Sequence, residues 1–231
     1  MKLVFLMTAF VASLSLTSTV FANHPGENLD EVMASRETYF QPINIPSAPD
    51  FSLLNTNGDL RSLSDFEDKI VVLNFIFTNC TGVCPLHAAR IKDIQEKINL
   101  TPMLDLVQFV SITTDPAKDS DTVRKEYAEI HDIDPINYTF LTSKSEDPKD
   151  LTRKLAAAYG IKFEPMDDGQ QMHSVVTFII DKGGRYAAKF HSLKFKSMNL
   201  VLYLNGLSNN SGQQHRPSSE NWWDRVKSIF Y

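Results

Sequence analysis

The sequence predicts an α/β fold in which helices flank a central mixed sheet, and three observations carry this prediction. Residues 70–77 form a nearly continuous apolar, β-branched run, as expected of a central parallel strand that is buried on both faces. Strand-like and helix-like segments then alternate as far as Gly160. Beyond it the chain reads as two strands joined by a tight turn and then a helix, an order typical of a sheet covered by helices on both faces.

The first element of the predicted domain is a β-hairpin over residues 51–63. Residues 51–54 and 60–63 are strand-like, and Asn57-Gly58 lies between them. Asn-Gly is among the strongest short-range hairpin signals, because both positions tolerate the positive φ that tight hairpin turns require.

The remaining elements follow the same reading. After Cys84-Pro85, Ile91, Ile94 and Ile98 recur at helical spacing. The later segments are a strand at 106–113, a helix at 120–130, a strand at 138–141, a helix at 148–159 with Gly160 as its C-cap, a strand at 175–181, a turn at 182–184, a strand at 185–190 and a helix at 195–207. This order predicts a thioredoxin-like fold with an N-terminal hairpin.

The N-terminus predicts export. Residues 1–22 combine Lys2, an apolar run and the small-residue site Val20-Phe21-Ala22, which is typical of a signal peptide cleaved after Ala22. An uncleaved anchor is the alternative, since the apolar run nearly reaches spanning length. Both interpretations place the folded part in the periplasm or at the outer face of the inner membrane, and no later segment is apolar enough to cross a bilayer.

The rest of the chain divides by composition. Residues 23–45 read as a polar leader, 46–207 as the folded domain and 208–231 as a flexible linker with a short C-terminal amphipathic segment. Trp222-Trp223 and the following basic residues suit an interfacial or partner-binding helix, or a segment that packs back on the domain. The net charge of -5 and pI near 5.7 argue against a nucleic-acid-binding protein.

The only two cysteines, Cys80 and Cys84, predict a chemical rather than a structural role. A disulfide between them would close a loop of about five residues and contribute only about 2 kcal/mol. The pair lies between the central strand and the next helix, where sites form in open α/β sheets. Pro85 favours the first helical position, which places Cys84 near the N-cap, where thiolates are stabilised. Gly82 lets the loop curl so that both sulfurs face one point.

Two chemistries remain open for this pair. A Cys-x-x-Cys spacing would indicate a redox pair, but here three residues intervene, which suits a metal clamp. Thiolate and imidazole together suit copper or zinc. Of the six histidines, His24 and His215 fall in the leader and the tail, His131 ends a helix, and His191 follows a hairpin strand toward solvent.

His87 and His173 are the nearer histidines. His87 follows Cys84 by three positions, so proximity is not excluded. His173 precedes the strand at 175–181, in the loop that lies against the cysteine turn in thioredoxin-like folds. That loop usually carries a cis-proline, but here it reads Gly169-Gln170-Gln171-Met172. A histidine at this point completes a Cys/Cys/His site.

Three motifs resemble the Sco/SenC family, whose members are copper chaperones that help to assemble the dinuclear copper centre of cytochrome c oxidase. They are residues 78–85, residues 111–116 with Asp115-Pro116, and His173 before a strand that ends at Asp181. The resemblance spans residues 46–207. It implies that Cys80, Cys84 and His173 bind one copper ion, Cu(I) or Cu(II).

The sequence departs from the family pattern in two respects. Met172 stands where many members have an aspartate, which removes a carboxylate next to the histidine. Family members are usually anchored in the membrane, whereas residues 1–22 look cleavable.

Two functions follow from these observations. The first is a metallochaperone that is not an enzyme and delivers copper to the copper-site subunit of the oxidase. The second is a periplasmic thiol–disulfide oxidoreductase, in which Cys80 and Cys84 form a reversible disulfide and act on cysteines of the oxidase subunit or of other exported proteins. A peroxidase is a weaker interpretation, because no Arg or Lys lies in the cysteine turn. Expected partners are the oxidase, other periplasmic copper chaperones or thiol reductants, and a membrane contacted through the terminal segments.

Overall fold

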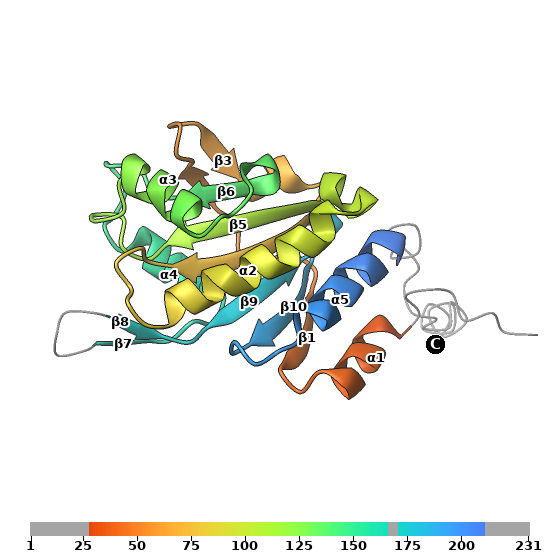
Figure 1. Ribbon diagram of the computed structural model, residues 1–231. Coiled ribbons are helices and arrows are strands. Elements are labelled where there is room, and N and C mark those ends of the chain that lie inside the picture. Colours follow the sequence, from red (N-terminus) through yellow and green to blue (C-terminus); the bar gives the residue numbers. More distant parts are fainter. Residues whose placement is uncertain (1–27, 166–170, 211–231) are drawn as a thin grey trace, which may run out of the picture.

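A six-stranded mixed sheet of order β1-β10-β9-β4-β5-β6 forms the centre of the protein in the computed structural model, which describes residues 28–165 and 171–210 (Figure 1). Its strands are β1 (Phe40–Ile45), β4 (Ile70–Ile76), β5 (Val107–Thr113), β6 (Tyr138–Leu141), β9 (Val176–Ile180) and β10 (Tyr186–His191). Two short hairpins lie outside it, β2 (Ser52–Leu54) with β3 (Leu60–Ser62) and β7 (Phe163–Pro165) with β8 (Gln171–His173). The helices are α1 (Leu29–Arg36), α2 (Val83–Asn99), α3 (Asp121–Ile130), α4 (Leu151–Ala158) and α5 (Ser197–Asn210). The predicted thioredoxin-like arrangement and its N-terminal hairpin are confirmed.

Strand β4 is central, as its apolar run predicts. All seven of its residues are buried. It pairs in parallel with β5 and antiparallel with β9, and β5 pairs in parallel with β6. The carboxyl ends of β4, β5 and β6 therefore meet the amino end of β9 at one edge of the sheet, which is where sites form in such folds.

The two faces of the sheet carry separate cores. Helices α1, α2, α3 and α5 cover one face (Figure 1), where Ile91, Ile94 and Ile98 of α2 pack with residues of α1 and α5 and with the sheet. On the other face α4 and the β2–β3 hairpin cover a cluster that contains Phe75 and Tyr159. Helix α2 thus packs its apolar face against the sheet, and the cysteine pair lies at the start of this helix.

The N-terminal segment differs from the predicted polar leader, 23–45. Its described residues form α1 and the edge strand β1, which pairs antiparallel with β10. The Phe40 ring lies 4.9 Å from that of Tyr203 on α5, and a Cβ at Gly206 would come within 2.5 Å of the Leu29 side chain. The sequence hides these elements because an edge strand buries little: only one of the six residues of β1 is buried.

Several element boundaries also differ from the prediction. Helix α2 begins at Val83, so Cys84 is its second residue and Pro85 its third rather than its first. Proline is tolerated there because the first amide groups of a helix have no partner within it. Helix α4 starts at Leu151, three residues after the predicted start. The helix ends at Ala158 with Tyr159 as its C-cap, so the predicted C-cap Gly160 lies one residue further on, where its φ of +90° suits glycine.

Two predicted terminal features lie outside the described residues: the signal peptide at 1–22 and the C-terminal segment from residue 211 onward, including Trp222 and Trp223. Residues 208–210 of the predicted linker belong to α5. Within the described residues, no helix combines the length and the apolar character that a membrane span needs.

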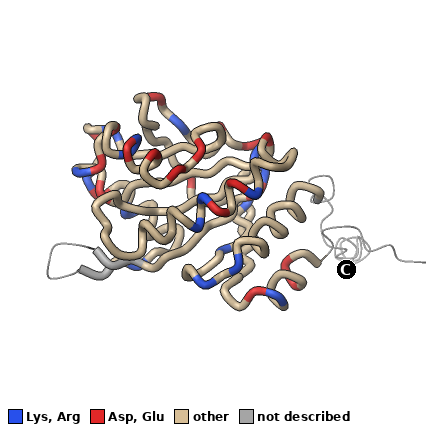
Figure 2. The backbone as a smooth tube through the Cα atoms, viewed as in Figure 1, with Lys and Arg blue, Asp and Glu red and all other residues tan. Residues whose placement is uncertain are grey.

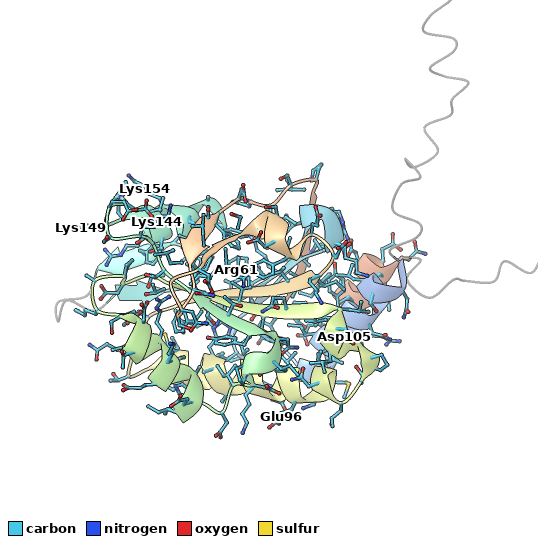
Figure 3. The ribbon with its side chains drawn as sticks, turned by 90° about the horizontal axis from the view of Figure 1, so that it is seen from above. Arg61, Glu96, Asp105, Lys144, Lys149 and Lys154 are labelled. Atoms are coloured by element: carbon cyan, nitrogen blue, oxygen red, sulfur yellow. The ribbon has the colours of Figure 1, made fainter. Side chains whose placement is uncertain are left out.

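Charged residues of both signs are interspersed over most of the fold, but the start of α2 and the loop before it carry none (Figure 2). The first charged residue after Lys69 is Arg90. Lys144, Lys149 and Lys154 lie together at one end of the molecule, along the segment that leads from β6 into α4 (Figure 3). The carboxyl edge of the sheet therefore combines an uncharged loop, residues 77–82, with lysines in the segment that follows β6.

A substitution in α1 tests whether the N-terminal segment belongs to the domain. Met33 is 2% exposed and packs in the core shared by α1, α2 and α5. We expect Met33→Ala to lower the free energy of unfolding by about 2–5 kcal/mol in urea titrations, because it leaves a cavity. Val32→Ala is the matched control, since Val32 is 41% exposed and should shift stability by less than about 0.5 kcal/mol. Equal effects of the two variants would contradict the packing of α1.

Candidate metal centre

The two cysteines lie at the junction between β4 and α2, joined by the cysteine loop, residues 77–82. The amide of Cys80 donates to the Phe77 carbonyl at 3.3 Å, which folds this loop back on the end of β4. Cys84 is 2% exposed, Cys80 is partly exposed, and both are free thiols. The site therefore pairs one accessible sulfur with one buried sulfur.

Burial raises the pKa of the Cys84 thiol well above its usual range, and the hydrogen bond and charge interaction with Cys80 raise it further. A hydrogen bond from the backbone at Phe77 acts in the opposite direction but is outweighed. The expectation that the start of α2 favours the thiolate is therefore wrong for Cys84. The start of a helix carries only a partial positive charge, which stabilises a thiolate modestly. The free-energy cost of removing the thiolate from water exceeds this stabilisation here.

An apolar cluster surrounds Cys84. Its members come from β4, the cysteine loop, α2, α3 and β6 and include Ile76, Phe77, Ala88, Tyr127 and Phe140. The Tyr127 hydroxyl donates to the Cys84 carbonyl at 3.2 Å, and burial raises the pKa of this tyrosine, so it stays protonated. Helix α3 thus supports the first turn of α2 from the side.

Asp119, which lies two residues before the start of α3, is a supporting residue of the site. Its carboxylate is 1% exposed and accepts the Thr78 amide at 3.3 Å. The hydroxyls of Thr78 and Thr113 also donate to it. Burial raises the pKa of Asp119, although these hydrogen bonds act to lower it. One buried carboxylate therefore ties the cysteine loop to the end of β5 and to the start of α3.

The backbone of His173 lies in β8, and its side chain falls outside the described part of the structure. Strand β8 pairs with β7, His173 opposite Phe163, and leads directly into β9. Because β9 runs antiparallel to β4 with Asn74 opposite Thr177, the same register continued by four residues would bring His173 level with Thr78. The fold thus directs the chain at His173 toward the cysteine loop.

The other histidines that the structure describes make contacts of their own. His87 is buried, and its Nε2 is 2.9 Å from the Thr177 hydroxyl. His131 packs against Tyr127, and burial lowers its pKa. His191 is partly buried rather than solvent-facing, and it hydrogen-bonds to the Gln41 side chain at 2.8 Å. His24 and His215 are outside the described residues.

No three His, Cys, Asp or Glu side chains gather into a metal-binding group in the part of the chain that is described, which leaves out the His173 side chain. Asp115, which resembles a family feature, forms an ion pair with Lys118 at 3.4 Å. The Met172 side chain, like that of His173, is outside the described part. What the structure describes is a cysteine pair and the backbone path of its predicted third ligand.

A family model described as SCO1/SenC matches residues 43–201 of the chain. Among curated proteins, a SCO2-like protein of Rickettsia prowazekii is 32% identical over 148 residues, which cover 61% of this chain and 67% of that protein. The mitochondrial SCO2 homologue of Mus musculus is 29% identical over 140 residues, 59% of this chain and 53% of the relative. The SCO1 homologue of Bacillus subtilis is 26% identical over 155 residues, 66% and 77% of the two chains.

Solved structures show the same fold. A SCO1/SenC family lipoprotein of Bacillus anthracis aligns with a TM-score of 0.65 and 25% identity over 73% of this chain and 98% of its own. A structure described as BsSco, of the Sco family of cytochrome c oxidase assembly proteins, aligns with a TM-score of 0.63 and 21% identity over 73% and 96%. Copper-bound yeast Sco1 aligns with a TM-score of 0.62 and 22% identity over 77% and 98%.

The unequal exposure of the two thiols predicts unequal reactivity. In the reduced native protein at pH 8, we expect iodoacetamide to modify Cys80 before Cys84, since Cys84 is buried and its raised pKa keeps it protonated. Peptide mass spectrometry over time measures both rates. In urea the two rates should converge. Faster modification of Cys84 in the native state would contradict the described burial.

The contacts of Asp119 predict a supporting role. Asp119→Ala leaves the buried Thr113 hydroxyl and the partly buried Thr78 donors without their acceptor, so we expect a loss of about 1–3 kcal/mol in the free energy of unfolding. Asp119→Asn, which retains one acceptor oxygen, should lose less. The control is Glu126→Ala on the exposed side of α3. If Glu126→Ala and Asp119→Ala destabilise equally, the buried contacts do not carry the effect.

Proposed function

Because the chain belongs to the SCO1/SenC family, we propose that it binds one copper ion through Cys80, Cys84 and His173 and delivers that ion to the dinuclear copper site of cytochrome c oxidase. The observation that carries the proposal is the position of the cysteine pair beyond the carboxyl end of β4, at the edge of the sheet where β9, the first strand after His173, begins. Thiolates and imidazole are ligands that suit copper.

The metal-free thiol pair supports a binding role that depends on proton release. Cys84 keeps its proton in the metal-free state, because burial raises its pKa. A thiol must lose its proton to bind a metal ion, so copper binding and proton release are coupled. Copper then supplies the positive charge that compensates the thiolate in this apolar surrounding.

The exposure pattern supports transfer of the ion. Cys80 is partly exposed, and Val83 and Leu86 in the first turn of α2 are 41% and 62% exposed. No charged residue lies between Lys69 and Arg90. A partner could therefore approach Cys80 without displacing ion pairs and exchange ligands at the accessible sulfur while Cys84 still holds the ion. Export to the periplasm or the outer face of the inner membrane, as residues 1–22 predict, would bring the protein to its acceptor.

The solved relatives support copper as the cargo. Yeast Sco1 and Bradyrhizobium japonicum ScoI are described with copper bound. BsSco is described as a member of a family of cytochrome c oxidase assembly proteins. For this chain the oxidase subunit as acceptor, Cu(I) or Cu(II) as the state carried and one ion as the stoichiometry belong to the proposal.

A second function, thiol–disulfide exchange, is favoured by one specific observation. The Cys80 side chain acts on the pKa of the Cys84 thiol, which indicates that the two thiols lie close together. The BsSco structure is described as revealing a disulfide switch. In this reaction the Cys80 thiolate would attack a partner disulfide, and Cys84 would then resolve the mixed disulfide by forming the internal one. The same pair can serve both functions, because only the dithiol binds metal.

Removing the imidazole tests the ligand set. We expect His173→Ala to weaken Cu(I) binding at least about 100-fold in competition with a chromophoric chelator, because loss of even an outer-shell partner costs about 10–100-fold. In the Cu(II) form, the sulfur-to-copper charge-transfer band should shift or disappear. The matched control is His191→Ala, since the His191 side chain hydrogen-bonds to the Gln41 side chain and lies on β10.

The same variants separate the two functions. Thiol–disulfide exchange by His173→Ala should stay close to that of the unchanged protein, because Cys80 and Cys84 are intact. Unaltered copper affinity in His173→Ala would overturn the three-ligand site. Rapid reduction of protein disulfides together with weak copper binding in the unchanged protein would instead favour the oxidoreductase.

A further inference from the structure

His87 is a buried polar side chain that the proposed copper ligands do not use. It lies on α2, one turn after Cys84, and is 2% exposed. Its Nε2 is 2.9 Å from the Oγ1 of Thr177, which is fully buried on β9. Buried hydrogen bonds of this kind are costly to leave unmade, so each partner constrains the position of the other.

Thr177 belongs to a polar row that crosses the sheet beneath α2. Thr177 on β9 is opposite Asn74 on β4, and Asn74 is opposite Ser111 on β5. The Ser111 hydroxyl donates to the Asn74 side-chain oxygen at 2.7 Å, and all three residues are buried. The helix therefore meets polar groups of three adjacent central strands at the level of its second turn.

This polar row separates two apolar clusters on the same face of the sheet. On one side, Ile91, Ile94 and Ile98 of α2 pack into the larger core. On the other side, Cys84 and Ala88 pack into the small cluster around the site. Apolar contacts are not directional, so the small cluster alone does not define how the start of α2 lies relative to β9. The hydrogen bond between His87 and Thr177 is directional, so it fixes how the start of α2 lies relative to β9.

We propose that His87 and Thr177 are positioning residues, which set the distance between the cysteine pair and the third copper ligand. His87 follows Cys84 by three residues on α2, and Thr177 follows His173 by four residues along the chain that enters β9. The hydrogen bond thus joins α2, the helix that carries Cys84, to β9, the strand that follows His173. The inference rests on the proposed function, since it takes His173 to be a ligand.

The test measures copper binding by Thr177 variants in two backgrounds. Thr177→Val keeps the shape of the side chain and removes the hydroxyl. We expect it to weaken Cu(I) binding about 10-fold, as the loss of an outer-shell partner does, and to shift the charge-transfer band of the Cu(II) form. Thr177→Ser retains the hydroxyl, so its Cu(I) affinity and its charge-transfer band should match those of the unchanged protein. In the His173→Ala background, Thr177→Val should have no further effect on copper affinity.

His87→Leu provides an independent route, in case Thr177→Val does not fold. It removes the other partner and should weaken copper binding to the same extent, and the double variant should be no weaker than either single one, because both remove one interaction. Thermal unfolding followed by circular dichroism verifies that each variant is folded before copper is added.

The outcomes separate the two proposals. Copper affinity and spectrum unchanged in both Thr177→Val and His87→Leu would overturn the positioning role while leaving His173 as a ligand. An equal loss with and without the His173 imidazole would also overturn it, because the effect would then arise elsewhere. If His173→Ala alone leaves copper affinity unchanged, the ligand set itself fails, and the positioning role fails with it.

Discussion

The antiparallel pairing of β9 with β4 is the constraint on which the site depends. A parallel neighbour would send its amino end to the opposite edge of the sheet, far from the cysteine loop. Because β9 runs antiparallel, its amino end lies at the edge of the sheet where β4 ends, and His173 precedes β9 by three residues. The proposed copper site would therefore join residues about 90 positions apart in the sequence, because this strand pairing brings their segments to one edge of the sheet.

Hydrogen bonds rather than apolar packing hold the parts of this edge together. The cluster around Cys84 is small compared with the two main cores, so it supplies limited packing energy. Asp119 instead fixes the cysteine loop to β5 and α3, and His87 joins α2 to β9. Buried polar groups of this kind specify one arrangement strongly, since each alternative leaves donors or acceptors unsatisfied.

The sequence predicted most of the fold because its central strands and its helices carry strong periodic signals. Residues 70–77 were readable as a central strand, and Asn57-Gly58 as a hairpin turn, from residue type alone. The edge strand β1 was not readable, because a half-exposed edge needs no apolar pattern. Cys80 and Cys84 were identified by spacing and position, whereas Asp119 and the His87–Thr177 contact were missed. Both depend on contacts between residues that are 41 and 90 positions apart in the sequence. No local sequence pattern indicates such contacts.

The burial of Cys84 gives the cysteine pair a defined order of events. In the metal-free protein the accessible Cys80 meets solvent and partners first, while Cys84 remains protonated behind it. An incoming cation or a disulfide bond each removes that buried proton, so metal binding and oxidation compete for one chemical step. If the protein is exported, as residues 1–22 predict, and binds copper as proposed, this competition would decide how much of the pair can hold the ion, because disulfides persist in oxidising compartments. Burial, which raises the pKa of Cys84, opposes the proton loss that both reactions need, so under the proposed function the supply of reductant would set how much dithiol can bind the ion.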